Sequence, residues 1–419
     1  MVNLFSRKIR NGDSGNSHLV VLLFVFTIIF QLTSLKFIWG IEPLSRILNS
    51  MALVILFVLV GFTLNKSYSR LVWNQYLIPG MMISFGIILN IVISCFSDIS
   101  NVNLLGTALP WLLYLIIPYY FYKNKIDPMS MWKWYYYFLT IFMLLGLADY
   151  FYFSQLSGLK ILITPFGNYL GGKFSWLYMN EDLTPHLRYY GCFYEPGTLA
   201  MFLLPAISYA FFKRYYFGLM PLLVAFYLTL SLGGFISLIL LVLLFTYKSI
   251  AKSKKTLIIS ILSIVLLSSI IYSYTANLIK EEYNEKGNSA TVREESVSKM
   301  SEDLPTMIFK YPLGIPYSSK TSELEKVKIF SGTNFLLGTY LQFGGIISLV
   351  GIILVLFVSM KITIKKIISL NLSVDEKIIY SSLIVLFPFI FQRTTIWDSA
   401  LFGLMFAPSI IASLVDSDK

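Results

Sequence analysis

The stretch from Arg188 to Gly197 holds the densest set of side chains that could do chemistry. It reads Arg-Tyr-Tyr-Gly-Cys-Phe-Tyr-Glu-Pro-Gly, and an apolar run follows at once. Because proline suits the first position of a helix, Glu195 is expected at a helix mouth, beside the positive end of the dipole. A carboxylate there can act as a general base, and the guanidinium of Arg188 can bind an oxyanion through paired hydrogen bonds. The alternative is that Glu195 only complements the dipole and that Arg188 anchors the chain at an interface.

A second group of polar residues lies further along the chain, around Arg293. A Pro-x-Gly turn is predicted within 311–316, and Asn334 lies where a later apolar run begins. Arg393 is a third arginine, in a short link between two apolar runs. Arginine suits phosphate because its planar fork makes bidentate, charge-assisted bonds. Arginines on one face of a membrane would therefore fit an anionic, lipid-linked substrate.

Several classes of chemistry lack the residues that they need. The two cysteines, Cys95 and Cys192, and the two histidines, His18 and His186, exclude a thiolate metal cluster and make a zinc site improbable. A disulfide between the cysteines stays open. The sequence has no P-loop, no Gly-rich dinucleotide turn, no paired acids of the DxD kind and no HExxH motif. We therefore expect no metal and no cofactor.

The elements that must position these residues are apolar helices. Hydrophobic residues make up 56% of the 419-residue chain and charged residues only 13%, about half of what a soluble domain carries. The apolar residues fall in long runs, and in a bilayer such runs must close their own backbone hydrogen bonds as helices. The net charge of +11 does not indicate nucleic acid, because the basic residues lie in short links between the runs, as membrane orientation requires.

The predicted fold is an all-α integral membrane protein, a single polytopic domain over 1–419. About twenty apolar residues cross a bilayer, and twelve runs qualify. The first follows Arg7, Lys8 and Arg10 but is too long and lacks the cleavage site of a signal peptide, so we interpret it as an uncleaved span. The predicted spans are 19–37, 47–64, 75–96, 104–122, 132–154, 196–212, 215–231, 234–247, 256–275, 334–359, 378–391 and 397–414.

The run from 215 to 247 could be one long helix or two short ones around Gly233-Gly234. Two helices put more than half of the 33 basic residues on one side, whereas the short links opposite hold only Lys36, Arg46 and Arg393. The positive-inside rule then favours two helices, with both termini cytoplasmic. Two long segments, 155–195 and 276–333, fall on the outer side, and loops of that length are usually functional or disordered.

Together these features resemble the Wzy family of O-antigen and polysaccharide repeat-unit polymerases. The resemblance rests on twelve spans, on Arg-x-x-Gly-x-Phe-x-Glu-Pro-Gly at Arg188–Gly197, and on a second long outer loop with Arg293 and a Pro-x-Gly turn. That family belongs with the O-antigen ligases in one membrane glycosyltransferase superfamily. The ligases typically place a His-Asn pair where the second loop enters the next span. Here that position reads Thr333-Asn334, which favours a polymerase over a ligase.

The resemblance implies a multi-pass protein of the bacterial inner membrane with two periplasmic loops, active in surface polysaccharide or lipopolysaccharide biosynthesis. Its implied partners are membrane lipid, undecaprenyl-pyrophosphate-linked oligosaccharides and a co-polymerase that sets chain length. The implied catalytic residues are Arg188 and Arg293, which would stabilise the leaving pyrophosphate, and Glu195, which would act as base. The implied substrate-binding residues are Tyr190, Tyr194, Asn334 and Arg393.

Three alternatives stay open beside the polymerase. The first is an O-antigen ligase, and the second is a flippase or another transporter of lipid-linked oligosaccharides. Transporters usually show inverted repeats and broken helices, and the sequence gives little sign of either. The third is a membrane acyltransferase, for which His186 would be the candidate residue.

Overall fold

The computed structural model describes residues 18–26, 51, 54–55, 58, 76–97, 117–118, 120–124, 126–152, 160–164, 167–171, 176–178, 188–193, 196–250, 305, 308–315, 336–368 and 372–390. Most of these residues are helical. The longer helices are α4 (Leu77–Ser97), α6 (Met129–Tyr152), α7 (Pro196–Lys213), α8 (Tyr216–Leu228), α9 (Leu232–Ile250), α13 (Leu336–Ile368) and α14 (Val374–Ile390).

Each of these helices coincides with one apolar run that was predicted as a span. Helical residues also occur within the runs 19–37, 47–64 and 104–122, whereas 256–275 and 397–414 lie outside the described residues. Among the described helices, two are long and apolar enough to cross a membrane, namely Ile78–Phe96 of α4 and Gly344–Lys366 of α13. The helical character of the predicted spans is therefore confirmed where the chain is described.

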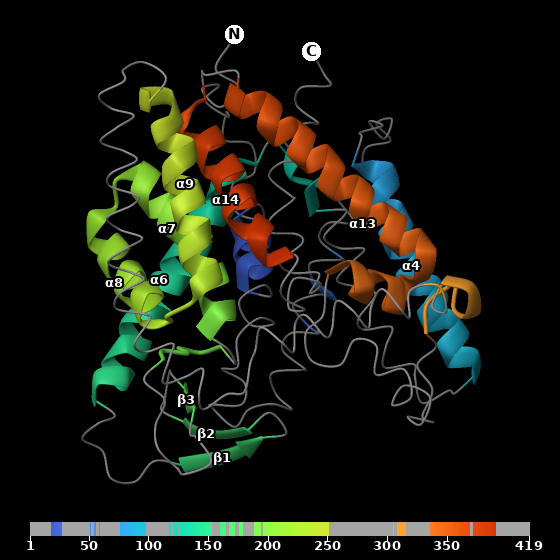
Figure 1. The fold of residues 1–419 in the computed structure, drawn as a ribbon, viewed down its shortest axis with the longest axis horizontal. Coiled ribbons are helices and arrows are strands. Elements are labelled where there is room, and N and C mark those ends of the chain that lie inside the picture. Colours follow the sequence, from blue (N-terminus) through green and yellow to red (C-terminus); the bar gives the residue numbers. More distant parts are fainter. Residues whose placement is uncertain are drawn as a thin grey trace.

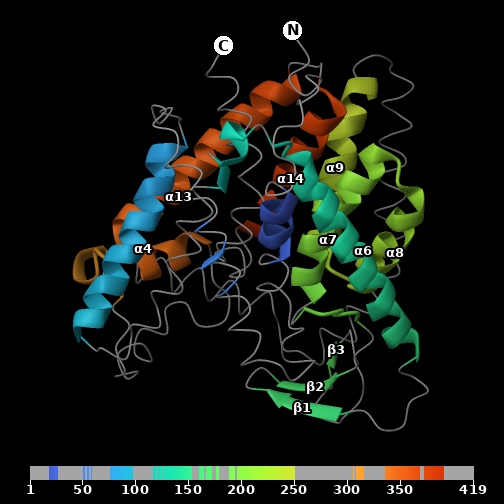
Figure 2. The same ribbon diagram turned by 180° about the vertical axis from the view of Figure 1, so that it is seen from behind.

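The helices form two groups, which lie on opposite sides of the molecule in Figures 1 and 2. One group is a bundle in which α7 packs against α6, α8, α9 and α14. The other group is the pair α4 and α13. Every residue of α7 from Pro196 to Ala210 is buried, so this helix is covered all round and forms the centre of the bundle.

The run from 215 to 247 forms two helices, as the distribution of charge predicted. Residues 229–231 separate α8 from α9, and residues 214–215 separate α7 from α8. Arg214 (φ 61°) and Leu230 (φ 49°) take the left-handed conformation at these two links, which reverses the chain within a few residues. In Figure 1, α7, α8 and α9 accordingly run in alternating directions.

The segment 155–195, which was expected to be a loop, contains a small sheet. Strands β1 (Lys160–Thr164), β2 (Gly167–Gly171) and β3 (Trp176–Tyr178) pair antiparallel in the order β1-β2-β3. Thr164 pairs with Gly167, so a two-residue link closes the first hairpin. Figures 1 and 2 place the sheet beyond the end of the bundle where α6 ends and α7 begins.

Candidate functional site

The segment Arg188–Phe193, the described part of the predicted motif, lies at one end of the bundle. Four helix ends meet there, because α6 and α8 finish and α7 and α9 start at this level. All residues from Tyr189 to Phe193 are buried, and Arg188 is half-buried. The segment is therefore part of the packed end of the bundle and does not extend away from it as a surface loop.

Two hydrogen bonds fasten the segment to the end of α8. The Tyr189 N–H donates to the carbonyl of Leu228 (2.9 Å), and Nε of Arg188 donates to the carbonyl of Thr229 (3.0 Å). The last carbonyls of a helix lack partners within the helix, and a cation is favoured beside them. The contact of Arg188 is thus one that an anchoring arginine makes, and its role in binding an anion stays a prediction.

A tight turn follows, in which the Phe193 N–H donates to the carbonyl of Tyr190 (3.0 Å). Gly191 has φ +54°, a conformation that favours glycine, and a Cβ there would lie 3.3 Å from Leu199 of α7. The ring of Phe193 stacks on Phe202 of α7 at 5.1 Å between centroids. The turn therefore fixes the segment against the central helix just before the position of Glu195 in the chain.

Aromatic packing holds the segment against α6 as well. Tyr189 meets Tyr150 edge to face at 5.4 Å, and its hydroxyl lies 4.0 Å from the sulfur of Met143. Burial raises the pKa of Tyr189 well above its usual range, and the charges of Cys192 and Asp149 add to the effect. Burial also raises the pKa of the Cys192 thiol to about 12. Neither group is suited to acid–base or nucleophilic chemistry near neutral pH.

The predicted site residues are only partly within the described chain. Arg188 and Tyr190 belong to the same short segment, and Pro196 is the first residue of α7, as predicted. With 3% of its surface exposed, Tyr190 offers little area to a sugar ring in this conformation, and its binding role stays a prediction. The other predicted site residues lie outside the described residues: Tyr194, Glu195, Arg293, Asn334 and Arg393.

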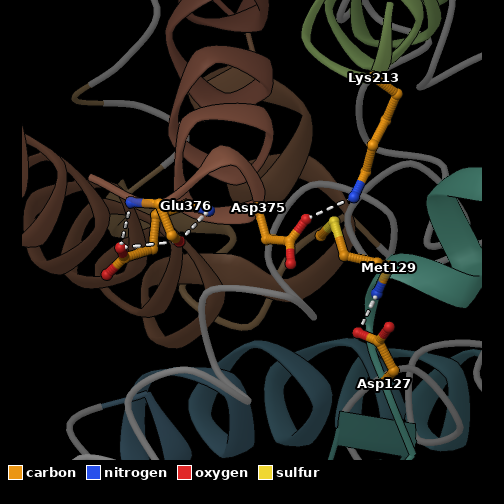
Figure 3. Close-up of polar contacts among 6 residues, drawn as sticks. Asp127, Met129, Lys213, Asp375 and Glu376 are labelled. Atoms are coloured by element: carbon orange, nitrogen blue, oxygen red, sulfur yellow. Dashed lines mark hydrogen bonds and ion pairs between the residues drawn. The ribbon is translucent and has the colours of Figure 1, made fainter. Parts of the chain in front are cut away.

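An ion pair joins α7 to α14 at the opposite end of the bundle (Figure 3). Nζ of Lys213, the last residue of α7, lies 2.8 Å from the carboxylate of Asp375 in the first turn of α14. Nearby, the Asp127 carboxylate accepts the N–H of Met129 at the start of α6 (2.9 Å). Desolvation by burial raises the pKa of Asp127, and the charge of Asp375 raises it further. The hydrogen bond from Met129 and the charge of Lys213 lower it in part.

The start of α14 is capped by Ser373. The Glu376 N–H donates to Oγ of Ser373 (3.2 Å), and the Glu376 carboxylate accepts the Ser373 N–H (2.9 Å), which is a capping box. The same carboxylate lies 3.3 Å from Nζ of Lys366 in the last turns of α13. Lys213, Lys366, Asp127, Asp375 and Glu376 all belong to the links that the distribution of charge assigned to one side.

The Pro-x-Gly turn predicted within 311–316 is present, but sequence reasoning did not predict how it is anchored. Residues 311–315 contact α13 at Gly345 and α4 at Asn90. A lone asparagine in the apolar run 75–96 and a Gly-Gly pair in the run 334–359 were the signals that could have pointed to this contact. Glycine is frequent in membrane helices, and a single polar residue does not identify its partner.

The described residues were also compared with the requirements of a metal site, and the chain was compared with known proteins. Within the described residues, no three histidine, cysteine, aspartate or glutamate side chains group closely enough to hold a metal ion, and no disulfide joins Cys95 and Cys192. No family model, no curated protein and no solved structure matches the chain.

Proposed function

We propose that the chain is a multi-pass inner-membrane glycosyltransferase of the O-antigen polymerase type. It would join undecaprenyl-pyrophosphate-linked oligosaccharide repeat units at the outer face of the membrane. The observation that carries the proposal is the packing of Arg188–Phe193, which brings one end of the predicted motif into the mouth of a helical bundle. Lys213 and Lys366 lie toward the opposite end of that bundle, and the positive-inside rule assigns such basic residues to the cytoplasmic side.

The outward faces of the helices support a membrane location. Large apolar side chains are exposed along α8, where Phe217 is 99% and Met220 63% exposed, and along α13, where Phe357 is 65% exposed. Similar exposed apolar residues follow α4 and α6. Soluble monomers rarely expose apolar surface on this scale, whereas lipid tails would cover it. This pattern accompanies the two helices that are long enough to cross a bilayer.

In the proposed reaction, a hydroxyl oxygen of one lipid-linked repeat unit attacks the anomeric carbon of the growing chain. The bond between that carbon and the pyrophosphate oxygen breaks, and undecaprenyl pyrophosphate leaves with the electron pair. Glu195, which precedes the first residue of α7, takes the hydroxyl proton. Arg188 and Arg293 stabilise the negative charge that develops on the pyrophosphate, and neither step needs a metal.

A transporter of lipid-linked oligosaccharides is the second candidate, because one observation favours it. Helix α13 is broken at Gly345, whose φ of 63° and ψ of −162° are not helical. Broken helices with irregular backbone at membrane depth are typical of transporter binding sites. A turn from the segment 276–333 contacts α13 at this break. A polymerase could use the same contact to hold that segment.

Deleting the gene in its own bacterium and separating the surface polysaccharide on a gel distinguishes these functions. Loss of a polymerase should leave lipid A–core with a single repeat unit, because units still reach the outer face and are still ligated. Loss of a flippase or of a ligase should leave no repeat unit. A full ladder in the deletion strain would contradict the proposed function.

Complementation of the deletion with single variants tests the roles of the residues. Arg188→Ala and Arg293→Ala should abolish the ladder while the protein still inserts, which an immunoblot of washed membranes monitors. Near-normal ladders from both variants would leave the arginines as anchors only. Glu195→Gln keeps the shape of the side chain and removes the base, so a retained ladder would assign that role to another residue.

A further inference from the structure

Residues 311–315 form a turn that fills the break in α13. The Gly314 N–H donates to the carbonyl of Tyr311 (2.9 Å), which closes the turn. In an unbroken helix the Ile346 N–H would donate to the carbonyl of Gln342. Here it donates to the carbonyl of Pro312 at 2.9 Å instead. The turn thus supplies an acceptor for the N–H that loses its helical partner at the break.

Gly345 makes this contact sterically feasible. A Cβ at Gly345 would overlap the Pro312 carbonyl oxygen and would lie 2.6 Å from the backbone of Leu313. Its φ of +63° is also a conformation that side chains rarely adopt. The sequence of α13 therefore permits a second backbone segment to approach at one position where an ordinary residue would exclude it.

Asn90 of α4 holds the other side of the turn. Its side chain is buried, with 3% exposed, and Nδ2 donates to the carbonyl of Ile315 at 3.2 Å. Oγ of Ser94, one turn further along α4, donates to the carbonyl of Asn90 (2.8 Å) and lies 3.4 Å from its Oδ1. The amide is thereby oriented with its oxygen toward Ser94 and its N–H₂ toward the turn.

Close packing fixes α4 and α13 relative to each other. A Cβ at Gly86 would overlap Ser348 and the Gly344 carbonyl of α13, and Gly351 lies against the start of α4. Oγ of Ser348 donates across the interface to the carbonyl of Ile83 (2.9 Å). Small residues at helix interfaces allow such close backbone approach within membranes. Asn90 and the break at Gly345 consequently face the turn from a rigid pair of helices.

The position of Asn90 along α4 gives the depth of this contact. Asn90 precedes the end of the helix at Ser97 by two turns, which is about 10 Å along the axis. The apolar part of a bilayer is about 30 Å thick, so the turn lies roughly a third of the way in from the outer surface if α4 spans it. Backbone groups at such a depth need partners within the protein.

We infer that Asn90 is a positioning residue that holds the second outer loop in the outer half of the membrane, by hydrogen bonding the turn that fills the break in α13. The inference rests on the membrane location in the proposed function and not on glycosyl transfer. In the chain, the anchored turn divides the loop, with Arg293 on one side and Asn334 on the other. The anchor thereby limits how far either predicted site residue can move from the helices.

Thiol labelling in purified membranes tests the anchor without any assay of activity. Ile315→Cys, in a Cys95→Ser background, places a thiol in the turn, where the residue is 7% exposed and bonds through its backbone. A membrane-impermeant maleimide should label it slowly. Asn90→Leu removes the donor with little change in volume and should speed labelling roughly threefold to twentyfold, as expected for one hydrogen bond between membrane helices. Asn90→Gln keeps an amide donor and should restore part of the protection.

Two controls separate release of the turn from general unfolding. Cys192, buried in the other helical group, stays in the same protein and should remain unlabelled. Asn124→Leu removes a similar hydrogen bond, from Nδ2 to the Tyr120 carbonyl (2.9 Å), and should leave labelling of Ile315→Cys unchanged. If Asn90→Leu also exposes Cys192, Asn90→Ser, which adds no bulk, decides the question. Equal labelling with and without the amide at position 90, or fast labelling in the parent, would overturn the inference.

Discussion

The two ends of the bundle around α7 are held together in different ways. Where α7 ends, one ion pair joins α7 to α14 and another joins α13 to α14. All four charged side chains are partly exposed. Where α7 begins, a buried segment bonds to the end of α8 through Tyr189 and Arg188 and packs its rings on α6 and α7. Exposed ion pairs contribute little, whereas buried backbone and aromatic contacts contribute more. The first end can therefore tolerate changes that the second cannot.

The largest difference between the ends should appear in thiol chemistry at the Arg188 end. Burial raises the pKa of Cys192 to about 12, so at pH 7.5 its thiolate population should be at least about a thousandfold below that of an ordinary cysteine. We expect a small maleimide to label half-buried Cys95 but not Cys192 in the folded protein, and both after denaturation, as mass spectrometry would read out. Rapid labelling of Cys192 in the folded state would show that the segment is open there.

Gly191 gives the next largest effect, on stability. Gly191→Val forces a β-branched residue to φ +54° and places its Cβ 3.3 Å from Leu199, which should cost about 2 kcal/mol or more. Gly191→Asn is the matched control, because asparagine tolerates the left-handed region better. Thermal unfolding in detergent measures both variants. Equal melting temperatures for valine, asparagine and glycine would mean that the turn does not need this conformation.

The ion-paired end should respond more weakly. Lys213 and Asp375 are 29% and 22% exposed, so Lys213→Ala should cost at most about 1 kcal/mol, and less in high salt. The exchange Lys213→Asp with Asp375→Lys should restore only part of the loss, because it places each charge at the wrong end of a helix dipole. A loss well above this, insensitive to salt, would show that the pair is more buried than its exposure indicates.

The sequence predicted the helices and the grouping of charges because both follow from local composition. Apolar runs identified α4, α6, α7 and α14 to within a few residues, and loop charge correctly split 215–247 into α8 and α9. The acids and bases near Lys213 were assigned to one side from the same count. These signals need no knowledge of which helices touch.

The anchored turns could not be predicted because they depend on contacts between distant parts of the chain. Asn90 and Ile315 are 225 positions apart, and nothing near either residue indicates the partner. The Arg188 motif was recognised, but its burial in the bundle was not. The segment bonds to the end of α8 at Leu228, three residues before the predicted end of that span. The sheet at 160–178 was missed because short strands inside a long loop give a weak periodic signal.

A comparison of one cation at each end of the bundle tests the central claim most directly. Arg188 donates a hydrogen bond of 3.0 Å to a helix end and Lys213 one of 2.8 Å, so alanine at either position removes a cation and that contact. Both variants would be expressed in the deletion strain at matched membrane levels, and the polysaccharide ladder measured. The account predicts that Arg188→Ala abolishes the ladder and that Lys213→Ala leaves it near normal. Equal ladders from the two variants would contradict an active site at the Arg188 end.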